Sequence, residues 1–222
     1  MCGGAGPRSE EDVFPNWLAT ALGGQGPFYT TESTQLRGQE VTSRERKTGS
    51  LANLKLKDVC LSCNTGWMSR LENRSKDLLL PMIGDQSLRL GIPEQRHLAA
   101  WCQLKALTLD AWYPDRFLPA NLLHRFSNSC QPLMSSIVDI ARLPPPSVGV
   151  GTLRGRTMMQ VEAPGFGKLD AIRVTWSWGY LVISLIVCAG LPPDLGLRME
   201  RPESGYLQIW PLVHDQAEWP PV

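Results

Sequence analysis

The sequence predicts an α+β fold: an N-terminal zinc-knuckle unit, then a helical segment, then a C-terminal, mainly antiparallel β region. Cys60-Leu-Ser-Cys63 has the spacing of a pair of metal ligands and stands directly before a helix signal. Residues 93–113 show the apolar periodicity of a helix, and past residue 146 the chain turns to strand-like segments. A chain of 222 residues that is 43% hydrophobic can bury a substantial core. We predict two domains, 1–85 and 90–222.

The N-terminal domain should begin with a short strand that leads into a helix. Pro15 stands near the start of this helix, where its missing N–H costs nothing, and Gly23-Gly24 ends the helix. Alternation of leucine and lysine over residues 54–57 predicts the second arm of a hairpin that leads into the cysteine pair. A helix over 65–80 should follow and stop at Pro81.

Residues 93–113 give the strongest helix signal in the chain. The segment opens with a proline in its first turn and carries apolar residues at three- and four-residue spacings. A shorter helix is predicted over 119–126. Cys102 and the tryptophans Trp67, Trp101 and Trp112 are interpreted as core residues, with base stacking as the alternative for the tryptophans.

The C-terminal region should be built from strands. A hairpin is predicted around Gly179, with Cys188 in its apolar second strand and with Ile172, Val174 and Trp176 on one face of the first. Arg173, Thr175 and Ser177 then lie on the other face. The predicted strands cover residues 148–153, 158–163, 171–178, 180–188 and 207–210.

The cysteine pair is predicted to bind structural Zn²⁺. Cys60 and Cys63 can both reach one tetrahedral ion at about 2.3 Å, and Asn64 is a good N-cap for the following helix. Cys2, followed by glycine, has the form of the second cysteine of another knuckle, whose partner would lie two residues before Met1. Two other arrangements remain open: three cysteines with a fourth ligand from water or another side chain, or a second pair with Ala5 in the ligand position. The alternative to zinc is a pair of buried thiols.

Together these motifs resemble the zinc-knuckle branch of the HNH endonuclease superfamily. The likeness rests on Cys2-Gly3, on the stretch Ser-Glu-Glu-Asp-Val-Phe-Pro-Asn-Trp over residues 9–17, and on Cys60-x-x-Cys63-Asn64-Thr-Gly-Trp67. It covers roughly residues 1–80. The resemblance implies a treble-clef ββα unit that cleaves DNA, with structural zinc and with Mg²⁺ or Mn²⁺ as the catalytic ion.

The resemblance also implies roles for individual residues. Glu11 would bind the divalent metal, and Asp12 occupies the position where the family has the histidine that activates water. Because aspartate has an ordinary pKa near 3.9, Asp12 is a weaker base at neutral pH than histidine, although it could act as a second metal ligand. Asn64 matches the motif's asparagine, and Asn73 or Glu72 would supply the last metal ligand. The alternative for the acidic residues is a solvated turn that caps the following helix.

A basic segment between the two motifs is the predicted nucleic-acid contact. Six positive charges on one hairpin could contact several phosphates, although such a run is often only a solvated loop. The residues are Arg37, Arg44, Arg46, Lys47, Lys55 and Lys57.

Net charge, cysteine content and the length of the apolar runs indicate the cellular compartment of the protein. The formal net charge of +1 indicates no global basic or acidic field. Six cysteines without a secretory leader favour a reducing compartment, and the longest apolar run, residues 180–191, is shorter than the roughly 20 residues of a spanning helix. We therefore expect a soluble, cytoplasmic protein without membrane association.

Three functions are compatible with the sequence. The first is an HNH-type metal-dependent endonuclease acting on DNA, with weak or lost cleavage because of Asp12. The second is a non-catalytic nucleic-acid-binding module that keeps the zinc scaffold. The third is a zinc-stabilised protein whose C-terminal half binds a partner that the sequence does not reveal.

Overall fold

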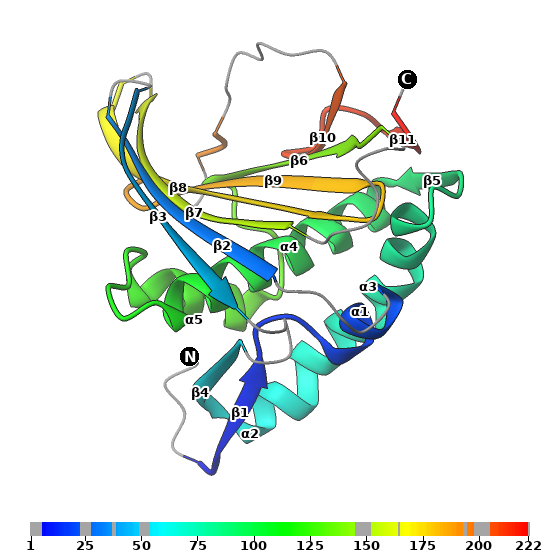
Figure 1. Ribbon diagram of the computed structural model, residues 1–222, viewed down its shortest axis with the longest axis horizontal. Helices are drawn as coiled ribbons and strands as arrows, with labels where there is room; N and C mark the ends of the chain where they lie inside the picture. The colour runs from blue at the N-terminus through cyan, green and yellow to red at the C-terminus, as the bar shows by residue number, and fades with distance from the viewer. Residues whose placement is uncertain are drawn as a thin grey trace.

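The computed structural model describes residues 6–22, 28–36, 39–48, 54–144, 152–163, 165–192, 195–197 and 205–221. It is a mixed α+β structure whose strand pairs are antiparallel with one exception, as the sequence predicts. Figure 1 shows a large curved sheet with helices against one face, and a small two-stranded unit below it.

The small unit has the order strand, strand, helix. β1 (Arg8–Asp12) pairs antiparallel with β4 (Lys55–Cys60). Three consecutive helical segments follow β4, namely α2 (Leu61–Cys63), the π-helical turn η2 (Asn64–Met68) and α3 (Ser69–Ile83). Between the two strands the chain forms α1 (Asn16–Ala21) and a long hairpin that belongs to the large sheet.

The prediction that the helix stops at Pro81 is wrong, because α3 continues to Ile83. Proline removes one helical hydrogen bond, which costs little so close to the end of a helix whose last residues are packed. Leu79, Met82 and Ile83 are all buried. The N–H of Gly84 then donates to Leu80 O at 3.1 Å and closes the helix.

Seven strands form the large sheet in the order β10-β6-β9-β8-β7-β2-β3. Only β2 and β7 run parallel among the neighbours. Of the two strands predicted at 148–153 and 158–163, the described residues 152–153 and 158–163 belong to a single strand, β7, and residues 148–151 lie outside the described residues. The structure adds a strand, β6, that was not predicted. The bounds are β2 (Phe28–Leu36), β3 (Gln39–Thr48), β6 (Ser136–Arg142), β7 (Thr152–Ala163), β8 (Gly167–Trp178), β9 (Leu181–Cys188) and β10 (Tyr206–Trp210).

The predicted hairpin at Gly179 is confirmed. β8 and β9 pair antiparallel from Trp178 and Leu181 outward, and Gly179 has a φ of 53°. A Cβ atom there would collide with the backbone of Ile83. Both the positive φ and the lack of space therefore require glycine at this turn. Ile172, Val174 and Trp176 point into the core, as the alternation predicts. A second small sheet, β5 (Leu88–Gly91) with β11 (Gln216–Trp219), was not predicted.

The long helix α4 (Ile92–Trp112) confirms the helix predicted at 93–113 and runs across one face of the large sheet (Figure 1). The shorter α5 (Ala120–Ser129) follows it. Trp101 of α4 packs edge-on against Trp178, with ring centroids 5.9 Å apart, and Phe14 packs on Trp178 at 5.4 Å. The ranges predicted as separate domains, 1–85 and 90–222, thus contribute side chains to one hydrophobic core.

A buried ion pair fixes the C-terminal end of α4 to the sheet. Arg156 of β7 is fully buried, and its Nη1 lies 2.8 Å from Asp110 Oδ1. Asp110 also accepts backbone N–H bonds from Phe117 at Oδ1 and from Leu118 at Oδ2, so both oxygens of its carboxylate accept hydrogen bonds. Within the described residues, no helix has both the length and the apolarity to cross a membrane.

Candidate functional site

The predicted acidic residues lie at the end of β1, where this strand passes α3 and α4. Glu11 is 5% exposed, and Val13 and Phe14, which follow it, are fully buried. A register irregularity in the β1–β4 pair falls between Ser9 and Glu11. The end of β1 therefore brings a carboxylate into the interior, which is costly unless the charge finds a partner.

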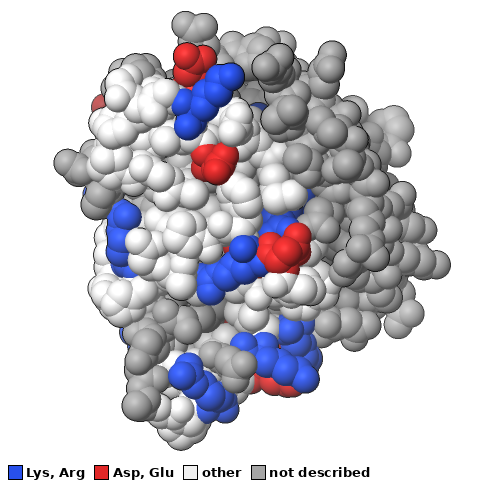
Figure 2. Space-filling view, turned by 90° about the vertical axis from the view of Figure 1, so that its left-hand side faces the viewer, with Lys and Arg blue, Asp and Glu red and all other residues white. Residues whose placement is uncertain are grey.

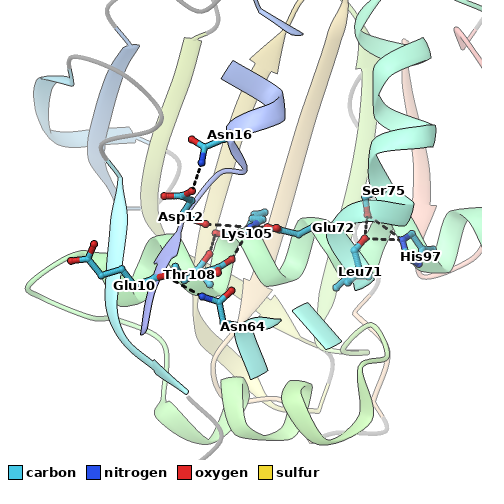
Figure 3. Close-up of polar contacts among 11 residues, drawn as sticks. Glu10, Asp12, Asn16, Asn64, Leu71, Glu72, Ser75, His97, Lys105 and Thr108 are labelled. Atoms are coloured by element: carbon cyan, nitrogen blue, oxygen red, sulfur yellow. Dashed lines mark hydrogen bonds and ion pairs between the residues drawn. The ribbon is translucent and has the colours of Figure 1, made fainter. Parts of the chain in front are cut away.

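That partner is Lys105, which the sequence analysis missed. Lys105 is a fully buried residue in the middle of α4, and its Nζ lies 3.6 Å from Glu11 Oε1 and 3.5 Å from the backbone oxygen of Asp12. It also donates a hydrogen bond to Glu72 Oε1 of α3. Figure 3 shows the ammonium of Lys105 between the end of β1 and Glu72. Lys105 is the one charged residue in the largely apolar stretch 98–109, and this is the sequence signal for the group.

Burial and the shared ammonium together set the titration of Glu11. Burial has the largest effect and raises the pKa of Glu11, Lys105 lowers it, and the charges of Glu72 and Asp12 raise it, with a net pKa of about 7. With both carboxylates ionised the cluster would hold one surplus negative charge. Glu11 therefore binds a proton near neutral pH.

Of the predicted ligands for the catalytic metal, the structure brings Glu11 and Glu72 to one ammonium. Asn64 bonds the adjacent backbone of β1, and Asn73 lies on the exposed side of α3. Asn64 Nδ2 donates to Ser9 Oγ at 3.1 Å and to the backbone oxygen of Glu10 at 3.0 Å. Asn73 is exposed and reaches only Ser69 Oγ of its own helix, at 3.5 Å. Glu72 is thus the better of the two alternatives for the last ligand.

These residues do not fit a divalent cation as they stand. Between Glu11 Oε1, Glu72 Oε1 and the backbone oxygen of Asp12 lies the ammonium of Lys105. A cation placed among the same oxygens would meet a buried positive charge at close range, where repulsion is poorly screened. The amide of Asn64 is meanwhile directed to β1.

Asp12, at the position where the resemblance expects a histidine, makes a local contact with the start of α1. Asn16, the first residue of α1, donates its side-chain N–H to Asp12 Oδ2 at 2.8 Å. Asp12 is half-buried, so its carboxylate stays within reach of solvent. The helix itself has Pro15 as its N-cap and no side-chain cap.

Cys60 and Cys63 lie at the junction of β4 and α2, both buried and neither in a disulfide. Cys60 Sγ lies 2.9 Å from Ser62 Oγ. The prediction that Asn64 caps the helix is wrong, because Cys60 is the N-cap and Asn64 has helical angles, φ −60° and ψ −55°. Its side chain bonds β1 instead of its own helix.

The zinc knuckle stays a prediction. Cys2 lies outside the described residues, and among those that are described no three cysteine, histidine or acidic side chains gather around a possible metal position.

The predicted basic residues do not lie on one hairpin. Lys55 and Lys57 are exposed on β4, which pairs with β1, and Lys55 Nζ lies 3.7 Å from Glu10 Oε2. Arg44, Arg46 and Lys47 belong to β3, at the edge of the large sheet. The side chains of these three and the whole of Arg37 lie outside the described residues. Figure 2 shows several separate groups of basic side chains on one face, with acidic ones among them.

Comparisons with known proteins found no relative: no family model, no curated protein and no solved structure matches this chain. The proposed function therefore rests on the geometry of the ββα unit and on the charged residues buried in it.

Proposed function

We propose that this chain is a nucleic-acid-binding module on an HNH-like ββα scaffold, in which the ammonium of Lys105 takes the place of the catalytic cation. The observation that carries the proposal is the position of Lys105 Nζ, bonded to Glu72 and 3.6 Å from Glu11. The resemblance gives Glu11, and Glu72 as one of two alternatives, to the metal, and here a single internal ammonium lies between their carboxylates.

An internal ammonium cannot replace the chemistry of a divalent ion. In metal-dependent hydrolysis the ion polarises a phosphoryl oxygen and lowers the pKa of its bound water, and both effects need open coordination positions. Lys105 is fully buried and offers none. With Asp12 in the place of the general base, the module lacks both parts of the hydrolytic machinery, so it binds without cleaving.

Two groups of basic residues support a nucleic-acid partner. Lys55 and Lys57 are exposed on β4, close to the ββα unit, and β3 carries three further basic residues in its sequence. Contacts of this kind neutralise phosphates and read no base sequence. The expected ligand is therefore duplex DNA bound with little sequence preference and with strong dependence on salt.

Fluorescence anisotropy with labelled duplexes of unrelated sequence tests this proposal. Lys55→Ala/Lys57→Ala should weaken binding to all duplexes alike and should flatten the dependence of affinity on salt by about two units of slope. Arg89→Ala/Lys168→Ala removes two exposed charges on other strands and is the control. Absence of binding at low salt by the wild type would overturn the nucleic-acid proposal.

Incubation of plasmid DNA with Mg²⁺ or Mn²⁺ tests the loss of cleavage. The wild type should leave the plasmid intact. Cleavage that depends on the metal and disappears in Glu11→Gln would show that the first function, the active endonuclease, is correct.

A further inference from the structure

A second polar site lies apart from Lys105, on another side of α3. It is a cavity of about 270 Å³ lined by α3, the N-terminal half of α4 and the segment that follows α5. Arg74, Arg96 and His97 line it, together with Cys130 and Gln131. In Figure 3 the labelled Ser75 and His97 of this site lie well away from Lys105.

The two arginines give the cavity its charge. Arg74 and Arg96 are exposed and come from different helices, and within the described residues neither has an ion pair or hydrogen bond. Arginines usually occur near carboxylates, and two that line one small cavity with no such partner repel each other. A bound anion would relieve this repulsion and would accept several N–H bonds from the planar guanidinium groups.

His97 is held in place by its neighbours so that one ring nitrogen remains for a ligand. Its Nε2 lies 3.1 Å from the backbone oxygen of Leu71 and 3.1 Å from Ser75 Oγ. Because Ser75 already donates its hydroxyl hydrogen to Leu71 O at 2.7 Å, Nε2 carries a proton and donates. Burial lowers the pKa of His97 and so favours the neutral ring, in which Nδ1 is an acceptor. Nδ1 has no hydrogen bond among the described residues and the ring lines the cavity, so it can accept from a protonated phosphate oxygen or from a hydroxyl of the head group.

The start of α4 adds a further favourable contribution. This 21-residue helix has Gly91 as its N-cap with no side-chain cap, and Ile92 and Pro93 of its first turn line the cavity. The N-terminal end of a helix carries a partial positive charge that favours anions. Glu94, the acidic residue of this turn, offsets part of this contribution because its charge also acts on His97, so the two arginines must supply most of the attraction for an anion.

We propose that this cavity binds the phosphate group of a small phosphomonoester, held between Arg74 and Arg96 with His97 beside them. Two guanidinium groups provide the paired donors that a tetrahedral oxyanion prefers, and the small volume admits a phosphate with a short head group. The site is independent of the proposed DNA contacts on β4.

Nuclear magnetic resonance of the histidine rings, at fixed pH, tests the proposal with inorganic phosphate and with glycerol 3-phosphate as probes. The chain has three histidines, so the signals can be assigned by substitution. The His97 signals should shift with a saturable dependence on either probe, while His124 and His214, which do not line the cavity, should not respond. Glycerol should have no effect on any of the three.

Arginine variants distinguish a specific phosphate site from non-specific attraction of anions to positive surface charge. Arg74→Gln and Arg96→Gln should each weaken phosphate binding at least about tenfold, because each removes charge-assisted hydrogen bonds. Lys76→Gln removes one exposed charge from the same helix outside the cavity and should bind like the wild type. A saturable response to phosphate alone would place inorganic phosphate rather than a phosphomonoester in the site. No saturable shift of His97, or equal weakening in Lys76→Gln, would overturn the proposal.

Discussion

Lys105 is the residue on which the ββα unit depends. An ammonium without solvent contact is stable only when its donors are satisfied, and here Glu72, Glu11 and the backbone of Asp12 surround it. The same contacts tie β1 and α3 to α4. Removing one member of such a buried group leaves the others uncompensated, which typically costs about 3–5 kcal/mol.

Glu11 should make stability depend on pH in the neutral range. Its pKa in the folded protein, about 7, exceeds its ordinary value of 4.5, so the folded state holds the proton more tightly than the unfolded state. This contribution is fully present below about pH 4.5 and is lost as pH rises through 7. Its size is on the order of 1–3 kcal/mol. The free energy of unfolding in urea, followed from pH 4.5 to pH 7, should therefore decline less for Glu11→Gln than for the wild type.

Glu10→Gln is the matched control for this experiment. Glu10 is the exposed neighbour of Glu11 on the same strand, and its only described ion pair is the exposed contact with Lys55. Its variant should follow the wild-type profile. If Glu11→Gln also keeps the wild-type profile, the buried carboxylate does not titrate in this range.

At the scale of elements, the sequence predicts the long apolar elements and misses the short ones. α4 and β9 match their predictions because each is a long, largely apolar stretch that is buried over most of its length, and β8 matches because its buried residues alternate with the strand period. β5 and β11 have four residues each, too few to show a period, and they form by pairing with each other across more than a hundred residues. The end of α3 was predicted too early, at Pro81, because a proline near the end of a helix costs little when the residues after it, here Met82 and Ile83, are buried.

The junction of β4 and α2 should depend on zinc. Metal analysis of the purified protein should find about one zinc per chain, since a pair of knuckle thiols is a ligand set typical of Zn²⁺. Cys60→Ser and Cys63→Ser should each lose the metal and reduce the hydrogen-exchange protection of β1 and β4.

Cys130→Ser is the control for the zinc experiment. Cys130 lies beyond α5 and lines the cavity beside Arg74 rather than the junction of β4 and α2, so this variant should keep its zinc. If the wild-type protein contains no zinc and is fully stable, Cys60 and Cys63 are a pair of buried thiols and the zinc prediction is wrong.

At the scale of the whole molecule, the site is completed by long-range contacts. Glu11 and Glu72 belong to the range predicted as the first domain, whereas Lys105 comes from the long helix of the second. The acidic motif is visible in the sequence, but no local pattern pairs it with a lysine more than thirty residues further along the chain. The same holds for Arg156 and Asp110, two charged residues that only the folded sheet brings together. Predictions from motifs thus found the carboxylates and could not find the charge that compensates them.

Binding of Mn²⁺ to the purified protein near neutral pH tests most directly whether Lys105 occupies the place that the resemblance gives to a catalytic cation. The paramagnetic resonance signal of free Mn²⁺ measures how much is bound. The wild type should bind none at Glu11 and Glu72, whereas Lys105→Ala, which frees the space between the two carboxylates, should bind one ion and gain thermal stability from it. Lys105→Ala/Glu72→Gln should lose this ion again. If the wild type binds one Mn²⁺ that Glu11→Gln removes, the carboxylates form a metal site in spite of Lys105, and the account is contradicted.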